Sequence, residues 1–170
     1  GIELNPYAAE LARVSVWIGE IQWMLRNGFD LNRAPVLKPL DTIENKNALV
    51  DADGNAAFWP DADVIVGNPP YMGAKFMKRR LGAEETARIR GVYKGRLPAF
   101  TDLVCFWFEN ARVMIEEGRA KRAGLVGTNS IRKNTNLNVM HRILDGTRIF
   151  AAWPEQRWDI DGAAVDVSLV

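Results

Sequence analysis

The chain has 170 residues, of which 48% are hydrophobic and 25% are charged, and its formal net charge is +1. This length and composition are typical of one globular domain with a substantial core and exclude an intrinsically disordered segment. The apolar runs are far shorter than the roughly 20 residues of a membrane span. Because no basic-then-apolar leader is present either, we expect a soluble, cytoplasmic protein that does not bind membranes.

A helix, an extended segment, a hairpin and a strand are predicted, in that order, in the first 67 residues. Apolar residues at helical spacing predict a helix that begins at Pro6, is capped by Asn5 and is closed by Gly28. PVLKPLDTI is expected to be extended as far as Asp41. NALVDADGNAAFWP predicts a hairpin around its Asp-Gly pair, and ADVIVG, residues 62–67, is typical of a strand buried in a parallel sheet.

Helices and strands continue to alternate in the remaining residues. FTDLVCFWFENARVMIEEG predicts a helix over 100–118, and RAGLVGTNS predicts a buried strand over 122–130. NLNVMHRILDG predicts a helix over 136–146, and TRIFAAW and AAVDVSLV predict strands over 147–153 and 163–170. The alternation favours an α/β fold with a doubly wound, mostly parallel sheet and a possible antiparallel hairpin near the C-terminus.

The residue types limit the chemistry of any site. Cys105 is the only cysteine and lies in an apolar run, which predicts a buried, reduced thiol. His141 is the only histidine, so histidine-based triads and multi-histidine metal sites are excluded. DADGN at 51–55 has the opening of a calcium loop, but Ala56 and Ala62 stand where glycine and glutamate are needed. We therefore expect no metal site.

In a doubly wound sheet, ligands gather at the carboxyl ends of the strands. Glu3 and Asp41 each follow an expected strand, and Asn68 to Tyr71 follow ADVIVG. A strand-end carboxylate can accept two hydrogen bonds from the vicinal hydroxyls of a ribose, and a second acid could accept from an adenine amino group. Without further context, an acid at a strand end is more commonly a helix cap.

Asn68-Pro69-Pro70-Tyr71 resembles the signature of the S-adenosylmethionine-dependent amino-methyltransferases. GIELNPYAAELA and PLDTI resemble the acidic segments of that family, and WPDADVIVGNPPYMG resembles its catalytic segment. TDLVCFWFENARVMIEEG and AKRAGLVGTNSIR resemble the helix and strand that follow. The amino-acid sequence of these segments is most similar to the methyltransferase region of the MmeI-like Type IIL restriction-modification enzymes.

The resemblance implies a Rossmann-like methyltransferase sheet, of which residues 1–170 form a partial catalytic domain. The first strand and the glycine-rich cofactor loop are then expected upstream of Gly1, and this piece alone is expected to be inactive. The implied reaction transfers a methyl group from S-adenosylmethionine to N6 of a flipped adenine in double-stranded DNA, within a larger restriction-modification protein. The implied catalytic residues are Asn68, Pro69, Pro70 and Tyr71, and the implied cofactor-binding residues are Glu3, Asp41 and Asn68.

The chemistry of an amino group explains the signature independently. The exocyclic nitrogen of adenine is a poor nucleophile because its lone pair is conjugated into the ring. If the side-chain oxygen of Asn68 and the carbonyl of Pro69 accept its two hydrogens, the lone pair turns toward the methyl group. The two prolines fix the backbone, and Tyr71 offers a flat face to a base taken out of the duplex.

Basic residues follow both strand ends. Residues 72–96 contain eight lysines and arginines against two glutamates, and residues 118–142 contain six against no acid. Residues 72–96 follow the catalytic segment directly, and residues 130–142 follow the next expected strand. Both stretches therefore begin at the edge where a flipped base would enter, and phosphate contacts are expected there. The expected contact residues are Lys75, Lys78, Arg79, Arg80, Arg132 and Lys133.

Several alternatives stay open at the level of sequence. Tyr71 favours adenine over cytosine within the family. The same four residues could position the nitrogen of an RNA base or of a protein glutamine, although the long basic insertion counts against glutamine. A non-catalytic nucleic-acid-binding piece is the third possibility. The sequence does not decide whether Trp107, Trp153 or Trp158 contacts cofactor or base.

Overall fold

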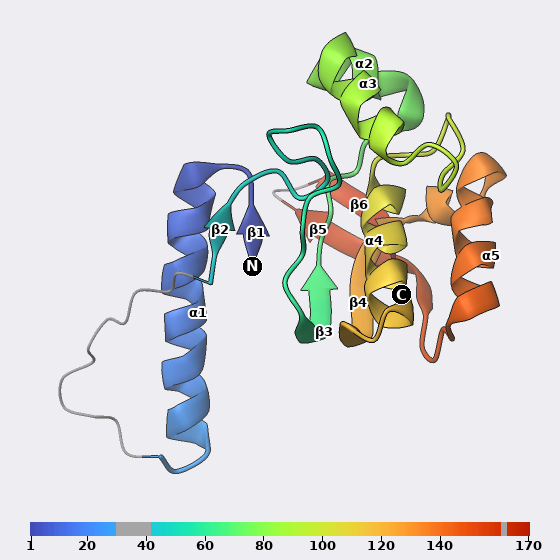
Figure 1. Cartoon of the computed structure of the whole chain (residues 1–170). Helices are drawn as coiled ribbons and strands as arrows, with labels where there is room; N and C mark the ends of the chain where they lie inside the picture. Colours follow the sequence, from blue (N-terminus) through green and yellow to red (C-terminus); the bar gives the residue numbers. More distant parts are fainter. Residues whose placement is uncertain (30–41, 161–162) are drawn as a thin grey trace.

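The structure is a computed structural model that describes residues 1–29, 42–160 and 163–170, with side chains left out over 158–160 and 163–165. This part of the chain contains five α-helices and six strands, arranged as a mixed α/β fold (Figure 1). The extended segment predicted to end at Asp41 lies outside the described residues.

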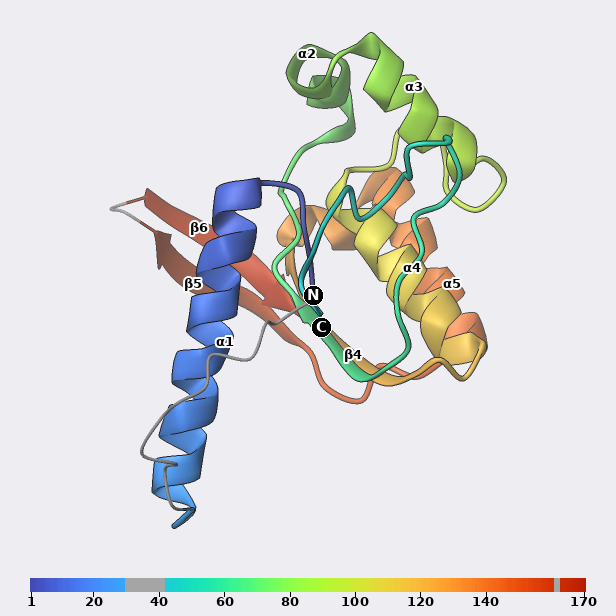
Figure 2. The same ribbon diagram turned by 60° about the vertical axis from the view of Figure 1, so that its left-hand side comes forward.

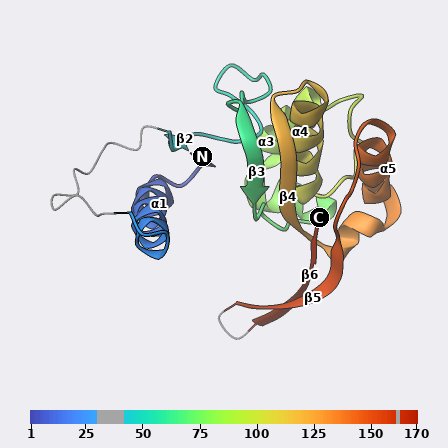
Figure 3. The ribbon, with the colours of Figure 1, turned by 90° about the horizontal axis from the view of Figure 1, so that it is seen from below.

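The N-terminal part forms a small unit of its own. Strands β1 (Ile2–Glu3) and β2 (Glu44–Asn45) pair in parallel, and helix α1 (Pro6–Arg26) packs beside them. The cap is confirmed, because Asn5 Oδ1 accepts hydrogen bonds from the amides of Tyr7 and Ala8. Gly28, at a φ of 73°, follows the helix as predicted. Helix α1 lies apart from the other long helices, and much of its apolar surface is exposed (Figures 1 and 3).

The main sheet has four strands in the order β3-β4-β6-β5. Strand β3 (Ala62–Gly67) pairs in parallel with β4 (Ala120–Thr128), whereas β6 (Ala163–Leu169) runs antiparallel to both β4 and β5 (Trp153–Ile160). The predicted C-terminal hairpin is confirmed, and it extends away from α4 and α5 (Figure 2). The expectation of a mostly parallel sheet is corrected to a mixed sheet, because the last two strands pair in the antiparallel sense.

Helices α4 (Val104–Glu116) and α5 (Leu137–Gly146) cover one face of this sheet (Figure 3). Helix α4 contributes more residues to the core than any other element, and residues of α2, α3, β4 and α5 pack around it. Tyr93 packs edge-on against Phe106 with their ring centroids 4.9 Å apart. Two short helices, α2 (Met77–Leu81) and α3 (Ala83–Val92), stand beyond the carboxyl end of β3 (Figure 1). Single turns of 3₁₀ helix occupy Ala74–Phe76, Asn129–Arg132 and Asn134–Asn136.

Two ionisable side chains are fully buried on α4. Cys105 is a free thiol, as predicted, and burial followed by the nearby charge of Asp102 raises its pKa to about 12. Glu109 is 0% exposed and accepts hydrogen bonds from Arg96, Arg112 and Arg142. Burial alone would raise the pKa of Glu109, but the hydrogen bonds from the three arginines lower it overall.

The predicted strand over 147–153 is wrong. Strand β5 begins only at Trp153, and the residues before it form no strand. The apolar residues Ile149 and Phe150 instead line a cavity beside β4, where Phe150 is 63% exposed. Strand β3 lies where it was predicted but is less buried than expected, because its described pairing is with β4 alone and Val66 is 79% exposed.

The turn at 51–55 forms as predicted, and the carboxylate of Asp51 makes hydrogen bonds within the turn itself. Asp51 Oδ1 accepts hydrogen bonds from the amides of Asp53 and Asn55, and Gly54 has a φ of 84°. Among the described residues, no group of three or more histidine, cysteine or acidic side chains is placed to hold a metal ion. In the same part of the chain, none of the helices has the length and apolar character that a membrane crossing requires.

Candidate active site

The segment Asn68 to Tyr71 begins directly where β3 ends, at Gly67. Pro69 is buried, whereas Asn68 and Pro70 are exposed. The hydroxyl of Tyr71 donates a hydrogen bond to Oδ1 of Asn68, and its half-buried ring packs against the core. Burial raises the pKa of Tyr71 above its ordinary value of 10.0, so the hydroxyl remains a proton donor at neutral pH.

A cavity of about 1070 Å³ opens at this end of the sheet. Its walls include Asn68, Pro69 and Pro70 from the loop after β3, and Glu3 from the end of β1. The structure therefore brings together predicted residues that lie 65 positions apart in the sequence. Asp41, the other predicted acid, lies outside the described residues.

Two tryptophans also line this cavity. Trp107 reaches it from α4 and is half-buried against the core. Trp59 precedes β3, and its Nε1 donates a hydrogen bond of 2.7 Å to the carbonyl of Ala48. The sequence left Trp107 undecided because an aromatic residue on an apolar helix is most often part of the core.

The chemistry of these walls suits a nucleoside. The carboxylate of Glu3 accepts one hydrogen bond of 2.8 Å from the amide of Asn5 through Oε1, and a carboxylate has further acceptor positions for ribose hydroxyls. The indole of Trp107 offers an apolar wall to an aromatic ring. Asn68 and Pro69 line the same cavity, and an amide oxygen and a backbone carbonyl are groups that can accept hydrogens from an amino group.

A basic cluster directly follows the loop. Lys75, Lys78, Arg79 and Arg80 are all exposed on the 3₁₀ turn and on α2. Lys75 Nζ lies 4.9 Å and Arg79 Cζ lies 5.1 Å from the centroid of the Phe76 ring. The ring therefore holds two positive charges together near the carboxyl end of β3.

The second basic segment starts at the neighbouring strand end. Arg132 and Lys133 are exposed after β4, and Arg132 Nη2 lies 2.9 Å from Oε1 of Glu155 on β5. This ion pair offsets part of the charge of Arg132. Trp153 lies on the wall of a different cavity, and the side chain of Trp158 is not among those described.

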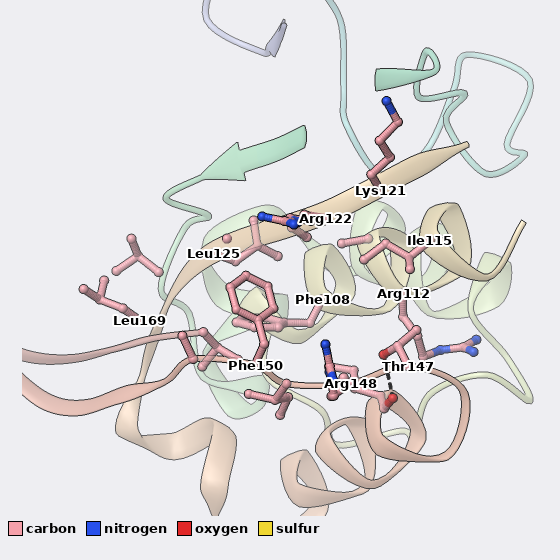
Figure 4. A pocket seen from close by; sticks show the side chains of 18 of the residues that line it. Phe108, Arg112, Ile115, Lys121, Arg122, Leu125, Thr147, Arg148, Phe150 and Leu169 are labelled. Carbon is pink, nitrogen blue, oxygen red and sulfur yellow. Dashed lines mark hydrogen bonds between the residues drawn. The ribbon is translucent and has the colours of Figure 1, made fainter. Parts of the chain in front are cut away.

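That other cavity has a volume of about 500 Å³ and lies beside the first half of β4 (Figure 4). Phe108, Leu125, Ile149 and Phe150 form apolar walls, and Arg122 Cζ lies 5.7 Å from the Phe150 ring centroid. None of the predicted site residues that the structure describes lines it. Because ligands of such sheets bind at the carboxyl ends of the strands, the cavity at Asn68 is the candidate active site.

Comparison with known proteins agrees with this geometry. Residues 1–170 match the sequence model of the family described as "MmeI, DNA-methyltransferase domain". DNA methyltransferase A of Bacillus subtilis (strain 168) is 27% identical over 172 residues, which cover 93% of this chain and 18% of that protein. A solved structure of the Type IIL restriction-modification enzyme MmeI in complex with DNA is 23% identical, with a TM-score of 0.66. The match covers 99% of this chain and 23% of that one, so the chain spans about a fifth of the length of either relative.

Proposed function

Because this chain belongs to the MmeI DNA-methyltransferase domain family, we propose that residues 1–170 are part of the catalytic domain of a DNA methyltransferase that forms N6-methyladenine. In this proposal the described sheet belongs to a Rossmann-like doubly wound sheet of a longer restriction-modification protein. The observation that carries the proposal is the position of Asn68, Pro69 and Pro70 directly after β3, on the wall of a cavity shared with Glu3 and Trp107, with Asn68 hydrogen-bonded to Tyr71.

S-adenosylmethionine fits the residues of this cavity. Its nucleoside would lie between the carboxylate of Glu3, which suits ribose hydroxyls, and the indole of Trp107, which suits the adenine ring. Asn68 lies on the same wall and would border both cofactor and substrate. When bound, the cofactor supplies an electrophilic methyl group.

Asn68 and Pro69 prepare the nucleophile. An amide oxygen has two lone pairs, and the hydrogen bond from Tyr71 uses one of them. The second lone pair of Asn68 Oδ1 can accept one hydrogen of the substrate amino group, and the carbonyl of Pro69 can accept the other. These two bonds localise the nitrogen lone pair and stabilise the positive charge that develops on the nitrogen. The surplus proton leaves after transfer, so no dedicated base is required.

Tyr71 has two roles in this proposal. Its hydroxyl fixes the side chain of Asn68, and its ring provides a stacking face for the target base. An adenine in a duplex hides its amino group in a base pair, so the base must leave the stack before it can be methylated. The basic residues on α2 and after β4 would hold the DNA phosphates on either side of the open position.

The direct test is a methyl-transfer assay with the complete protein and labelled S-adenosylmethionine. Double-stranded DNA, RNA and protein would be offered separately, and the DNA would be digested and analysed by mass spectrometry. We expect label in DNA as N6-methyladenine. Label in N4-methylcytosine would show that the target base is cytosine and not adenine. Label in RNA or in a protein glutamine would contradict DNA as the substrate. No transfer to any of the three would favour a nucleic-acid-binding role without catalysis.

A further inference from the structure

Asp102 lies directly before Leu103, the N-cap residue of α4, and an acid near the start of a helix often caps it. Its side chain does not do so, because no side-chain hydrogen bond caps the N-terminus of α4. The carboxylate points instead to the segment that follows Tyr71 and to the segment that follows β4. The role of this half-buried acid therefore lies outside its own helix.

The carboxylate joins three segments. Oδ1 accepts a hydrogen bond of 2.8 Å from the amide of Ala74, three residues after Tyr71. Oδ2 accepts from Oγ of Ser130 at 2.8 Å and from Nδ2 of Asn136 at 2.9 Å. Asn136 completes the arrangement, because its Oδ1 accepts a hydrogen bond of 2.9 Å from the amide of Asp102.

Two further hydrogen bonds hold the backbone carbonyls of the residues after Tyr71. The carbonyl of Ala74 accepts a hydrogen bond of 3.1 Å from Nη2 of Arg90 on α3. The carbonyl of Met72 accepts one of 2.9 Å from the amide of Leu103, the neighbour of Asp102. The catalytic loop is thus anchored by β3 where it begins and by the Asp102 region where it ends.

We propose that Asp102 is a positioning residue for methyl transfer, which holds the end of the loop 68–74 against the segment after β4 so that Asn68 and Tyr71 face the target base. The inference rests on the function proposed above. Asp102 touches neither reacting group, and it acts through the backbone of Ala74. Because small displacements of catalytic groups are costly to rate, its loss should affect turnover more than cofactor binding.

The variants Asp102→Ala and Asp102→Asn of the complete protein separate this role from general stability. Asp102→Ala removes every contact of the carboxylate, and we expect kcat to fall about 100-fold with the Kd for S-adenosylmethionine nearly unchanged. Asp102→Asn keeps an oxygen that can accept from Ala74 but cannot serve both Ser130 and Asn136, so we expect a fall of about tenfold. If Asp102→Ala does not fold, the result for Asp102→Asn decides alone.

Asp51→Ala is the matched control, because Asp51 also accepts two backbone amides in a loop but lies in the turn at 51–55. It should lower the melting temperature while leaving kcat close to that of the wild-type protein. Wild-type kcat in the folded Asp102 variants, or an equal loss in Asp51→Ala, would overturn the inference. Absence of methylation by the wild-type protein would instead contradict the proposed function on which the inference rests.

Discussion

The hydroxyl of Tyr71 donates a hydrogen bond to Oδ1 of Asn68, across the two prolines that separate these residues. The two polar side chains of the signature are therefore one unit. The hydrogen bond fixes the amide plane of Asn68 and leaves its second lone pair for a substrate. The aromatic ring and the hydroxyl of Tyr71 can be tested separately.

Tyr71→Phe keeps the ring and loses the hydroxyl. We expect the single-turnover rate to fall about tenfold because Asn68 is less well oriented, while the target base still leaves the duplex. The single-turnover rate of Tyr71→Ala should be lower still, since stacking of a base on an aromatic ring contributes about 1–3 kcal/mol. Fluorescence of 2-aminopurine at the target position measures the extrusion of the base. Equal rates in the two variants would show that the ring has no role of its own.

Glu3→Gln tests the acid at the end of β1. The amide keeps an acceptor for the amide of Asn5 but loses the charge, so we expect the Kd for S-adenosylmethionine to rise about tenfold. Isothermal titration calorimetry with the complete protein measures this change. Glu20→Gln, at an exposed position of α1, serves as the control and should bind like the wild-type protein. An unchanged Kd in Glu3→Gln would remove Glu3 from the cofactor site.

The double charge reversal Lys78→Glu and Arg79→Glu tests the basic cluster on α2. If both residues contact phosphates, DNA affinity falls and the slope of log K against log salt flattens by about 2. Lys121→Glu is the control, because Lys121 lies at the start of β4, away from its carboxyl end. Its exposed ion pair with Asp63 of β3 contributes little to stability. Fluorescence anisotropy over a salt series gives both quantities. An unchanged slope would mean that the cluster faces solvent.

Glu109→Gln tests the buried charge on α4. Replacing this 0% exposed acid removes the charge that pairs with Arg96, Arg112 and Arg142, and loss of one member of a buried pair costs about 3–5 kcal/mol. Urea denaturation should therefore show a large fall in the free energy of unfolding. Glu117→Gln, which affects a surface pair with Arg119, should change it far less, because exposed ion pairs contribute little to stability.

The same residue predicts a pH dependence with a definite sign. The pKa of Glu109 is lowered in the folded protein, so the ionised form favours folding. This contribution is complete above 4.5, the ordinary pKa of a glutamate, and is lost as the pH falls through the lower folded-state value. Unfolding free energies measured from pH 6 downward should therefore decrease more steeply for the wild-type protein than for Glu109→Gln. Parallel curves would contradict the assignment.

The sequence predicted the parts of the fold that rest on local signals. Asn5 with Pro6 marks the start of α1, ADVIVG marks β3, and the long apolar run marks α4, all near their observed positions. Strand β5 was misplaced because its sequence contains Pro154 and several charged residues. Glu155 has a φ of 55° within an irregular register, so this strand is defined by its pairing with β6 and not by its own pattern.

The residues of the candidate site could be predicted from the sequence only where they lie at the ends of predicted strands. Glu3 and Asn68 could be found because both follow strands, and strand ends meet at one edge. The proposed contribution of Asp102 could not be found, because the sequence placed this acid inside the helix predicted over 100–118. Its partners Ala74, Ser130 and Asn136 come from three separate segments, and only the folded chain brings them together.

The most direct test of the account is the rate of methyl transfer by Asn68→Ala in the complete protein. The variant removes the amide oxygen that is proposed to accept a hydrogen of the amino group, while the cavity walls formed by Glu3 and Trp107 remain. We predict that formation of N6-methyladenine falls by about 10²–10³-fold, with binding of S-adenosylmethionine and DNA largely retained. Methylation at a near wild-type rate would contradict the central role assigned to Asn68.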